Sequence, residues 1–166
     1  MFRLFYPNDY VDSTYQIDFR KLRIKGYKGV LFDIDNTLVR HGEPADDKAR
    51  ELFKSLKEQG VKYCLISNNQ RERVESFAKE VEAPFIENAH KPSTKGYKKA
   101  MKIMGIKAQE ALFVGDQLFT DVWGAKRAGM YSILVKPIHH KEEIQIVLKR
   151  YLERIILFFY KRQKSK

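Results

Sequence analysis

Cysteine is almost absent from this sequence: Cys64 is the only one among 166 residues. An intramolecular disulfide is therefore excluded, and with it the small secreted folds that depend on disulfides. Cys64 lies within an apolar run at residues 61–66, where a small buried hydrophobic side chain is a better interpretation than a catalytic thiol. This cysteine usage favours the reducing cytoplasm as the localisation.

Long apolar runs are absent as well. No stretch approaches the roughly 18 consecutive apolar residues that a membrane-spanning helix requires. Pro7 and Asp9 interrupt the N-terminal residues before an apolar core of signal-peptide length, so we do not expect secretion. The hydrophobic fraction of 43% is that of a globular protein, and at this length one domain is expected.

Acidic residues are outnumbered by basic ones. The chain has 32 Lys and Arg against 21 Asp and Glu, which gives a formal net charge of +11. Such an excess suggests a polyanionic partner, namely a phosphorylated substrate, an anionic membrane surface or a nucleic acid. Composition does not choose among them, and a merely solvated basic surface would give the same number.

Apolar, β-branched runs alternate with amphipathic patterns of helical period along most of the chain. This alternation predicts an α/β fold in three layers, a Rossmann-like central parallel sheet with helices on both faces. The first expected strand begins at Gly29 and runs into Asp33 and Asp35, whose spacing along a strand places both carboxylates on the same side. The other expected strands lie at residues 61–66, 84–88, 111–114 and 131–135, and the expected helices near 46–60, 70–80, 94–104 and 120–128.

Three parts of this single domain can be distinguished. Residues 1–28 are aromatic and irregular, and we expect them to cover one edge of the sheet. Within them, Asp18 is placed to cap a short helix that stops at Gly26. Residues 29–140 form the predicted core, and residues 141–166 a basic amphipathic helix and tail.

Polar side chains follow four of the predicted strands. Asp33 and Asp35 come after the first strand, and later strands are followed by the residues Ser67, Lys91, Asp116 and Asp121. A lone Asp-x-Asp is a weak signal, because such pairs also cap helices and fill turns. In a parallel sheet, however, the carboxyl ends of the strands meet at one rim, where ligands bind. The sequence therefore predicts that these carboxylates, a hydroxyl and an ammonium converge.

This set of groups suits the hydrolysis of a phosphate monoester. Its dianion approaches a carboxylate only if its charge is offset, as by Mg²⁺ and a fixed cation. Asp33, the carbonyl of Asp35 and Asp116 would suit Mg²⁺, and Lys91 would be the fixed cation. Asp33 could attack phosphorus while Asp35 moves the proton. Thr37 could orient Asp35, although a plain turn-stabilising role is equally open.

The motifs resemble those of the haloacid dehalogenase superfamily of phosphatases. The matching residues are Asp33-x-Asp35-x-Thr37, Ser67-Asn68, Lys91-Pro92 and Gly115-Asp116 with Asp121. The longer text around them is similar to the YqeG-type group of subfamily IIIA, whose relatives include mitochondrial phosphatidylglycerophosphatase.

The resemblance implies a role for each matching residue. It makes Asp33 the nucleophile, Asp35 the acid and base, and Asp116 a Mg²⁺ ligand. Ser67, Asn68 and Lys91 would bind phosphate.

Asp121 is the residue with the least specific assignment. In the first turn of a predicted helix, an acid favours the helix dipole whatever else it does. The alternative that we favour is a role toward the metal through a water or another ligand.

The spacing of the motifs bears on the substrate. The intervals from Asp33 to Ser67 and from Ser67 to Lys91 are each filled by one helix and one strand, which leaves no room for a cap domain. An open site suits a large substrate that itself excludes water, such as phosphatidylglycerophosphate, a nucleic-acid end or a phosphoprotein. A second copy in an oligomer could also serve as the lid.

The C-terminal segment combines helical apolar spacing with an excess of basic residues. From Lys136 onward there are nine basic residues and three acidic ones. A basic helix with an aromatic edge could lie on an anionic bilayer, at the inner face of the cytoplasmic membrane. Alternatively, it packs on the sheet and ends in a solvated tail.

Three functions remain for comparison. The first is a Mg²⁺-dependent phosphomonoester hydrolase that forms an aspartyl-phosphate. The second is a signalling module that stores a phosphoryl group on an aspartate, and the third is a nucleic-acid- or membrane-binding protein with a vestigial pocket. Asp35 and Thr37 favour the hydrolase, because an acid two residues after the nucleophile serves turnover rather than storage.

Overall fold

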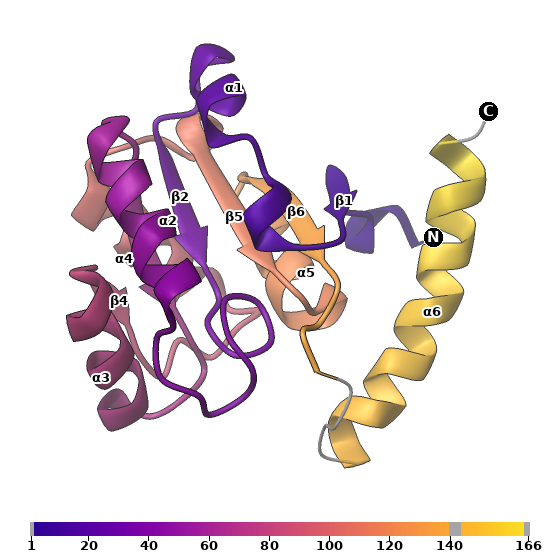
Figure 1. The fold of residues 1–166 in the computed structure, drawn as a ribbon. Coiled ribbons are helices and arrows are strands. Elements are labelled where there is room, and N and C mark those ends of the chain that lie inside the picture. Colours follow the sequence, from indigo (N-terminus) through magenta and orange to yellow (C-terminus); the bar gives the residue numbers. More distant parts are fainter. Residues whose placement is uncertain (1, 140–143, 165–166) are drawn as a thin grey trace.

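The computed structural model describes residues 2–139 and 144–164 of the chain. Its centre is a six-stranded sheet in which all pairings are parallel and the strand order is β1-β6-β5-β2-β3-β4 (Figure 1). The strands are β1 (Asp9–Val11), β2 (Gly29–Phe32), β3 (Lys62–Ile66), β4 (Phe85–Ile86), β5 (Ala111–Gly115) and β6 (Tyr131–Val135). The predicted parallel α/β sheet is confirmed.

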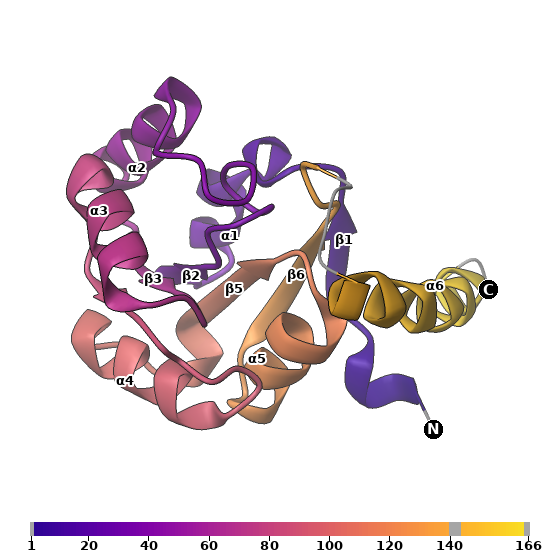
Figure 2. The same cartoon turned by 90° about the horizontal axis from the view of Figure 1, so that it is seen from below.

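Helices cover both faces of the sheet, which gives the expected three layers (Figure 2). The α-helices are α1 (Phe19–Ile24), α2 (Asp47–Glu58), α3 (Arg71–Val81), α4 (Thr94–Met104), α5 (Trp123–Arg127) and α6 (Ile144–Lys164). One core cluster joins α1, α2 and α3 to the sheet through Phe19, Phe53 and Phe77. A second joins α4 and α5 to the opposite face through Tyr97 and Ala125.

Strand β2 lies in the middle of the sheet and is buried along its whole length. Val30 and Phe32 belong to the first core cluster and Leu31 to the second, as the alternation of side chains along a strand requires. Cys64 on the neighbouring strand is also fully buried, and burial raises the pKa of its thiol to about 12. It therefore serves as a small hydrophobic side chain.

The N-terminal segment contributes an edge strand. Strand β1 pairs with β6 in the register Asp9 to Ile133, and Asn8 donates its amide to the Ser132 carbonyl at 2.9 Å. Further along, the Asp18 side chain accepts a hydrogen bond from the Lys21 amide at 2.9 Å and caps α1. Helix α1 ends just before Gly26, whose φ of 101° lies in the left-handed region.

The chain after β5 differs from the expected helix at residues 120–128. A π-helix, η4 (Leu118–Val122), begins earlier and continues directly into the short α5. The amides of Asp116 and Gln117 both donate to the Asp121 carboxylate, each at 3.1 Å. This carboxylate caps the turn from inside the helix, because it accepts from amides four and five residues earlier in the chain.

Helix α6 lies at the edge of the molecule beyond β1, beside the N-terminal residues (Figures 1 and 2). Ile156 packs with Leu118 and Leu134 in a third small core cluster, and the Tyr160 ring lies 5.5 Å from that of Tyr6. Within residues 2–139 and 144–164, no helix is long and apolar enough to cross a membrane.

Candidate active site

A tight turn at the end of β2 sets the position of the first two carboxylates. The Leu38 amide donates to the Ile34 carbonyl at 2.9 Å, and Asn36 takes a left-handed φ of 63°. The prediction that strand alternation places Asp33 and Asp35 on the same side is wrong, because β2 ends at Phe32 and the alternation does not extend to Asp35. The turn therefore directs Asp33 and Asp35 into two different surroundings.

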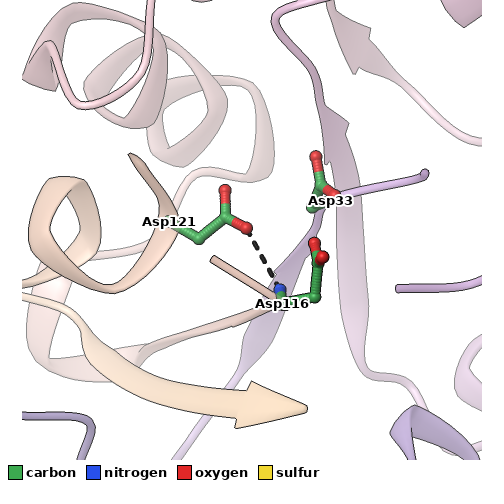
Figure 3. A group of neighbouring side chains, drawn as sticks. All are labelled: Asp33, Asp116 and Asp121. Atoms are coloured by element: carbon green, nitrogen blue, oxygen red, sulfur yellow. Dashed lines mark hydrogen bonds between the residues drawn. The ribbon is translucent and has the colours of Figure 1, made fainter. Parts of the chain in front are cut away.

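Asp33 belongs to a cluster of three buried carboxylates with Asp116 and Asp121 (Figure 3). One oxygen of each lies within 4.8 Å of the others, although the residues come from the ends of β2 and β5 and from η4. Gly115 makes this close packing feasible, since a Cβ on that residue would lie 2.5 Å from the Asp121 Oδ2. The predicted convergence at the rim of the sheet is therefore present for these three.

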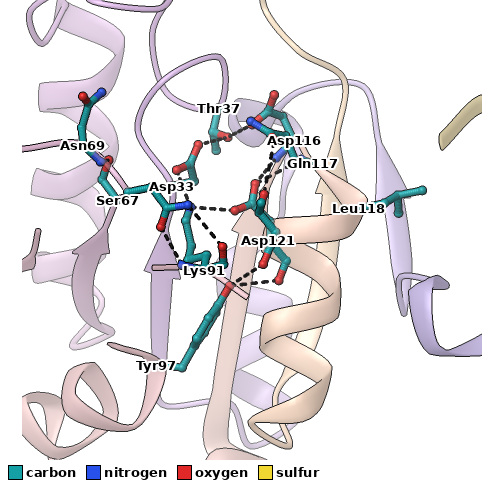
Figure 4. Close-up of polar contacts among 12 residues, drawn as sticks. Asp33, Thr37, Ser67, Asn69, Lys91, Tyr97, Asp116, Gln117, Leu118 and Asp121 are labelled. Carbon is teal, nitrogen blue, oxygen red and sulfur yellow. Dashed lines mark hydrogen bonds and ion pairs between the residues drawn. The ribbon is translucent and has the colours of Figure 1, made fainter. Parts of the chain in front are cut away.

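Lys91 lies in the middle of this cluster (Figure 4). Its Nζ is 2.6 Å from the Oδ1 atoms of both Asp33 and Asp121, and its side chain is almost fully buried. The Thr37 hydroxyl is 3.2 Å from Asp33 Oδ2 and from Asp116 Oδ1, so it contacts these two carboxylates rather than orienting Asp35 as predicted. Buried charges are retained when they are paired in this way.

The electrostatics of the cluster follow from its burial. Burial raises the pKa of Asp33 to about 6, because it outweighs the opposing effect of the Lys91 ammonium. Burial and the charges of Asp33 and Asp121 raise the pKa of Asp116 well above its ordinary value. Burial alone would lower the pKa of Lys91, but the charges of Asp121 and Asp33 raise it overall. The carboxylates therefore carry excess negative charge that a further cation would offset.

The donor set fits a hard divalent cation. The grouped ligand atoms are all carboxylate oxygens, which Mg²⁺ and Ca²⁺ prefer to nitrogen or sulfur. The structure therefore contains an acidic triad able to hold a metal ion, with the Asp121 carboxylate in it.

Asp35 occupies a separate polar pocket. Its Oδ1 accepts from the Gly42 amide at 2.8 Å and from Arg73 Nη2 at 2.9 Å, while its Oδ2 accepts from Asn69 Nδ2 at 2.9 Å. Burial acts to raise the pKa of Asp35, but the Gly42 amide and the Arg73 guanidinium outweigh it and lower the pKa overall. Asp35 is therefore held as a carboxylate.

The predicted phosphate-binding residues hold the neighbouring loops together. The Asn69 amide donates to Ser67 Oγ at 3.0 Å, which pins the turn after β3. The Asn68 side chain makes two hydrogen bonds with the backbone of Lys91. Asn68 Oδ1 accepts from the Lys91 amide at 2.7 Å, and Asn68 Nδ2 donates to the Lys91 carbonyl at 3.3 Å. Asn68 thereby ties the loop after β3 to the loop that carries the lysine.

Several residues at the site lie outside the predicted motifs. Arg73 and Asn69 hold Asp35, and Arg150 of α6 binds Asp116 through its carboxylate and, at 2.5 Å, its carbonyl oxygen. Glu153 contacts Arg150 at 3.0 Å and accepts from the Leu118 amide at 2.8 Å. The sequence does contain one sign of the Glu153 contact, because Glu153 is the only acidic residue in the basic segment 144–164.

Comparison with known proteins agrees with this geometry. Residues 41–129 match the haloacid dehalogenase-like hydrolases. The probable phosphatase YqeG of Bacillus subtilis is 36% identical over 162 residues, which cover 97% of this chain and 94% of that protein. The chain belongs to the haloacid dehalogenase-like hydrolase family. The expectation of a phosphatase of this superfamily is therefore confirmed.

Other relatives match less of their own length. Phosphatidylglycerophosphate phosphatase 1 of Arabidopsis thaliana is 28% identical over 94% of this chain, which spans 47% of that protein. Glyceraldehyde 3-phosphate phosphatase of Pyrococcus abyssi is 34% identical over 53% of this chain and 41% of its own length.

Solved structures show the same fold at low sequence identity. A hydrolase of this superfamily from Ehrlichia chaffeensis superposes with a TM-score of 0.58 at 17% identity, covering 79% of this chain and 98% of the other. One from Deinococcus radiodurans, solved with bound phosphate and sodium, gives 0.58 at 16% identity, covering 75% and 88%.

Proposed function

We propose that the chain is a Mg²⁺-dependent phosphomonoester hydrolase in which Asp33 forms an aspartyl-phosphate, and that its substrate is a lipid phosphate such as phosphatidylglycerophosphate. The observation that carries the chemistry is the buried contact of Asp33 with Lys91, 2.6 Å apart, beside Asp116 and Asp121 at the carboxyl ends of the strands.

Asp33, Asp116 and the carbonyl of Asp35 are the groups that we propose as Mg²⁺ ligands. Once bound, Mg²⁺ offsets the charge of the incoming phosphate and polarises its oxygens. Asp121 supports this set from behind, since its carboxylate binds Lys91 and the two backbone amides that open η4. Its part toward the metal is therefore proposed to be indirect.

In the first step, a carboxylate oxygen of Asp33 attacks phosphorus, and the bond from phosphorus to the ester oxygen breaks. Lys91 and Thr37 hold the two oxygens of Asp33 at 2.6 and 3.2 Å, which fixes the direction of the carboxylate. Lys91 also offsets the negative charge of the phosphoryl oxygens, while Ser67 and Asn68 bind them at the loop after β3. Asp35, which is ionised in the free site, takes up a proton from solvent when the negatively charged phosphate ester binds beside it, and donates that proton to the departing alkoxide.

In the second step, a water molecule attacks the phosphorus of the aspartyl-phosphate, and Asp35 accepts the proton that the water loses. Inorganic phosphate leaves and the Asp33 carboxylate is regenerated. The pocket of Gly42, Asn69 and Arg73 holds Asp35 in its ionised form, which is the form that accepts this proton.

Three observations support a lipid phosphate. The elements between Asp33 and Lys91 are α2, β3, α3 and β4, with no cap domain inserted among them. The net charge of +11 suits an anionic surface. The Arabidopsis relative that aligns with 94% of this chain is named for phosphatidylglycerophosphate. We therefore propose that the protein acts in the cytoplasm, at the inner face of the membrane. A nucleic-acid substrate is less favoured. An oligomer in which a second copy closes the site is compatible with the same chemistry.

The test is phosphate release from phosphatidylglycerophosphate in vesicles and from a soluble aryl phosphate, each with Mg²⁺ and with EDTA. We expect Mg²⁺-dependent turnover, preference for the lipid, and loss of turnover in Asp33→Asn. Activity on the soluble ester alone would overturn the lipid substrate. A phosphorylated protein that does not turn over would overturn hydrolysis and favour the phosphate-storage function.

A further inference from the structure

We propose that the outer side of α6, together with the adjoining turn η1 (Phe2–Phe5), is a binding surface for an anionic lipid bilayer. This inference rests on the proposed function, because a bilayer on this surface would bring the proposed lipid substrate close to the active site. Its physical basis is independent of catalysis and lies in three features of the surface.

The first feature is a stripe of exposed apolar side chains, which we call the α6 face. Seven large hydrophobic residues of α6 are 41–67% exposed, whereas Ile156 and Tyr160 on its inner side are buried. Their spacing of three and four residues places them along the helix side that the sheet does not cover. The α6 face consists of Val147, Leu148, Tyr151, Leu152, Ile155, Phe158 and Phe159.

Turn η1 extends this apolar surface. The Phe2 ring stacks on Phe159 with 6.1 Å between ring centres, and Leu4 of the same turn is 63% exposed. In the rest of the described chain, only Ile24, Ile103 and Ile138 are large hydrophobic residues of comparable exposure. Exposed apolar side chains are thus concentrated at one edge of the molecule, which marks an interaction surface.

The second feature is the charge around the stripe. Exposed basic side chains accompany it on α6, while the one acid of the helix, Glu153, is turned inward and buried against the Leu118 amide. These basic residues are Lys149, Arg154, Lys161, Arg162 and Lys164, of which Lys161 lies over the Tyr10 ring at 5.4 Å and Lys164 lies 3.6 Å from Asp9. A second copy of the chain would bring like charges together, so the complementary partner is anionic. Aliphatic and aromatic side chains between the charges suit the headgroup and acyl boundary of a bilayer rather than a nucleic acid.

The third feature is a cavity beside the α6 face that also borders Asp116. It has a volume of about 620 Å³ and lies between α6 and the ends of β1 and β6. Val147, Tyr151 and Arg154 line it on the α6 side, and Asp116 and Arg150 also border it. A phosphorylated headgroup in this cavity would therefore meet Arg150, whose guanidinium binds the fully buried Asp116 carboxylate.

The test measures binding of the full chain to vesicles by co-sedimentation, with phosphatidylcholine vesicles and with vesicles that also contain phosphatidylglycerol. We expect binding only to the anionic vesicles. Charge reversal in Lys149→Glu with Arg162→Glu should weaken it about 20-fold or more, since each basic residue near an anionic surface contributes roughly fivefold. Leu148→Ser with Phe158→Ser should weaken it about tenfold through lost apolar burial.

The matched control is Lys102→Glu with Ile103→Ser, an exposed basic and apolar pair on α4. It should bind anionic vesicles as the unmodified chain does, and circular dichroism with thermal unfolding would verify that every variant is folded. Equal binding to both vesicle types, or equal losses in the control, would overturn the proposal. The proposal would also be overturned if single-stranded DNA released the chain from the vesicles. The same holds if the chain bound no vesicles but associated with itself, and the α6 variants abolished that self-association.

Asp33→Asn separates this proposal from the proposed function. It should bind vesicles normally even though it cannot form the aspartyl-phosphate. If the unmodified chain binds anionic vesicles but hydrolyses no phosphate ester, the proposed function fails while the α6 face stands. If the chain hydrolyses phosphate esters but does not bind vesicles, the hydrolase function stands while the α6 face fails as a membrane-binding surface.

Discussion

The two carboxylates at the end of β2 are two positions apart in the sequence but lie in opposite electrostatic surroundings. Asp33 shares a buried cluster with Asp116 and Asp121, and burial raises its pKa to about 6. Asp35 is surrounded by the Gly42 amide, Asn69 and Arg73, and its pKa is lowered. The difference shows how one short turn places one carboxylate in a crowded acidic cluster and the other among hydrogen-bond donors.

The largest effect is expected from Asp33→Asn. The amide is nearly isosteric but cannot attack phosphorus, so kcat should fall about 10⁴-fold or more with every phosphate ester. Lys91 keeps its 2.6 Å contact with Asp121, and one of three crowded negative charges is removed, so the variant should fold. Steady-state kinetics measure the rate and circular dichroism the fold. A folded variant with normal turnover would show that Asp33 is not the nucleophile.

Asp35→Asn should act differently, because it removes a proton donor and acceptor rather than the attacking atom. With an alkyl phosphate, whose alkoxide needs a proton as it leaves, kcat should fall about 10³-fold. With a good aryl leaving group, the formation of the aspartyl-phosphate should be much less affected. Rapid-quench measurements with both esters provide the comparison. Equal losses of the first step with both esters would contradict the separation of roles between Asp33 and Asp35.

Much of this organisation is predictable from sequence because it is local. The buried run of β2 and the side-chain cap at Asp18 are encoded by adjacent residues, and both are found as expected. The convergence of Asp33, Lys91, Asp116 and Asp121 is non-local, yet it follows from the rule that parallel strands share one rim. Asp33 and Asp116 are therefore brought together, as the sequence predicted.

The features that sequence did not predict depend on contacts between distant segments. Strand β1 has only three residues and no apolar run, and its strand conformation depends on pairing with β6. Arg73 looks like an ordinary helix residue until the turn after β2 places Asp35 opposite it. Arg150 belongs to a helix whose packing against η4 cannot be read from its own periodicity. In each case the partner is too far along the chain to produce a local pattern.

Arg150→Met is expected to affect stability more than the chemistry of Asp33. It leaves the Asp116 carboxylate buried without its guanidinium partner, which should lower the free energy of unfolding by about 3 kcal/mol. Mg²⁺ should restore part of the loss, since a metal at Asp116 would offset the same charge. Chemical denaturation with and without Mg²⁺ measures both effects. The exposed Arg154→Met, on the same helix, should change stability by less than about 0.5 kcal/mol; equal losses in the two variants would contradict the role of the Arg150 contact.

The smallest predicted effect is that of Arg73→Met on the Asp35 pocket. Arg73 acts as a positioning residue, because its Nη2 holds Asp35 Oδ1 at 2.9 Å and the Gly42 and Asn69 contacts remain without it. One hydrogen bond to a charged group contributes roughly 1.5–3 kcal/mol, so kcat should fall about tenfold while KM stays unchanged. Arg73→Lys should recover part of the rate by keeping a donor near the carboxylate. The control is Arg71→Met on the same helix, which removes exposed contacts with Glu75 and Glu87 but none with Asp35 and should leave kcat as it is. A rise in KM at constant kcat would show instead that Arg73 binds the substrate. The Asp35 pocket would then bind phosphate as the Asp33 cluster does, and the proposed difference between the two would be lost.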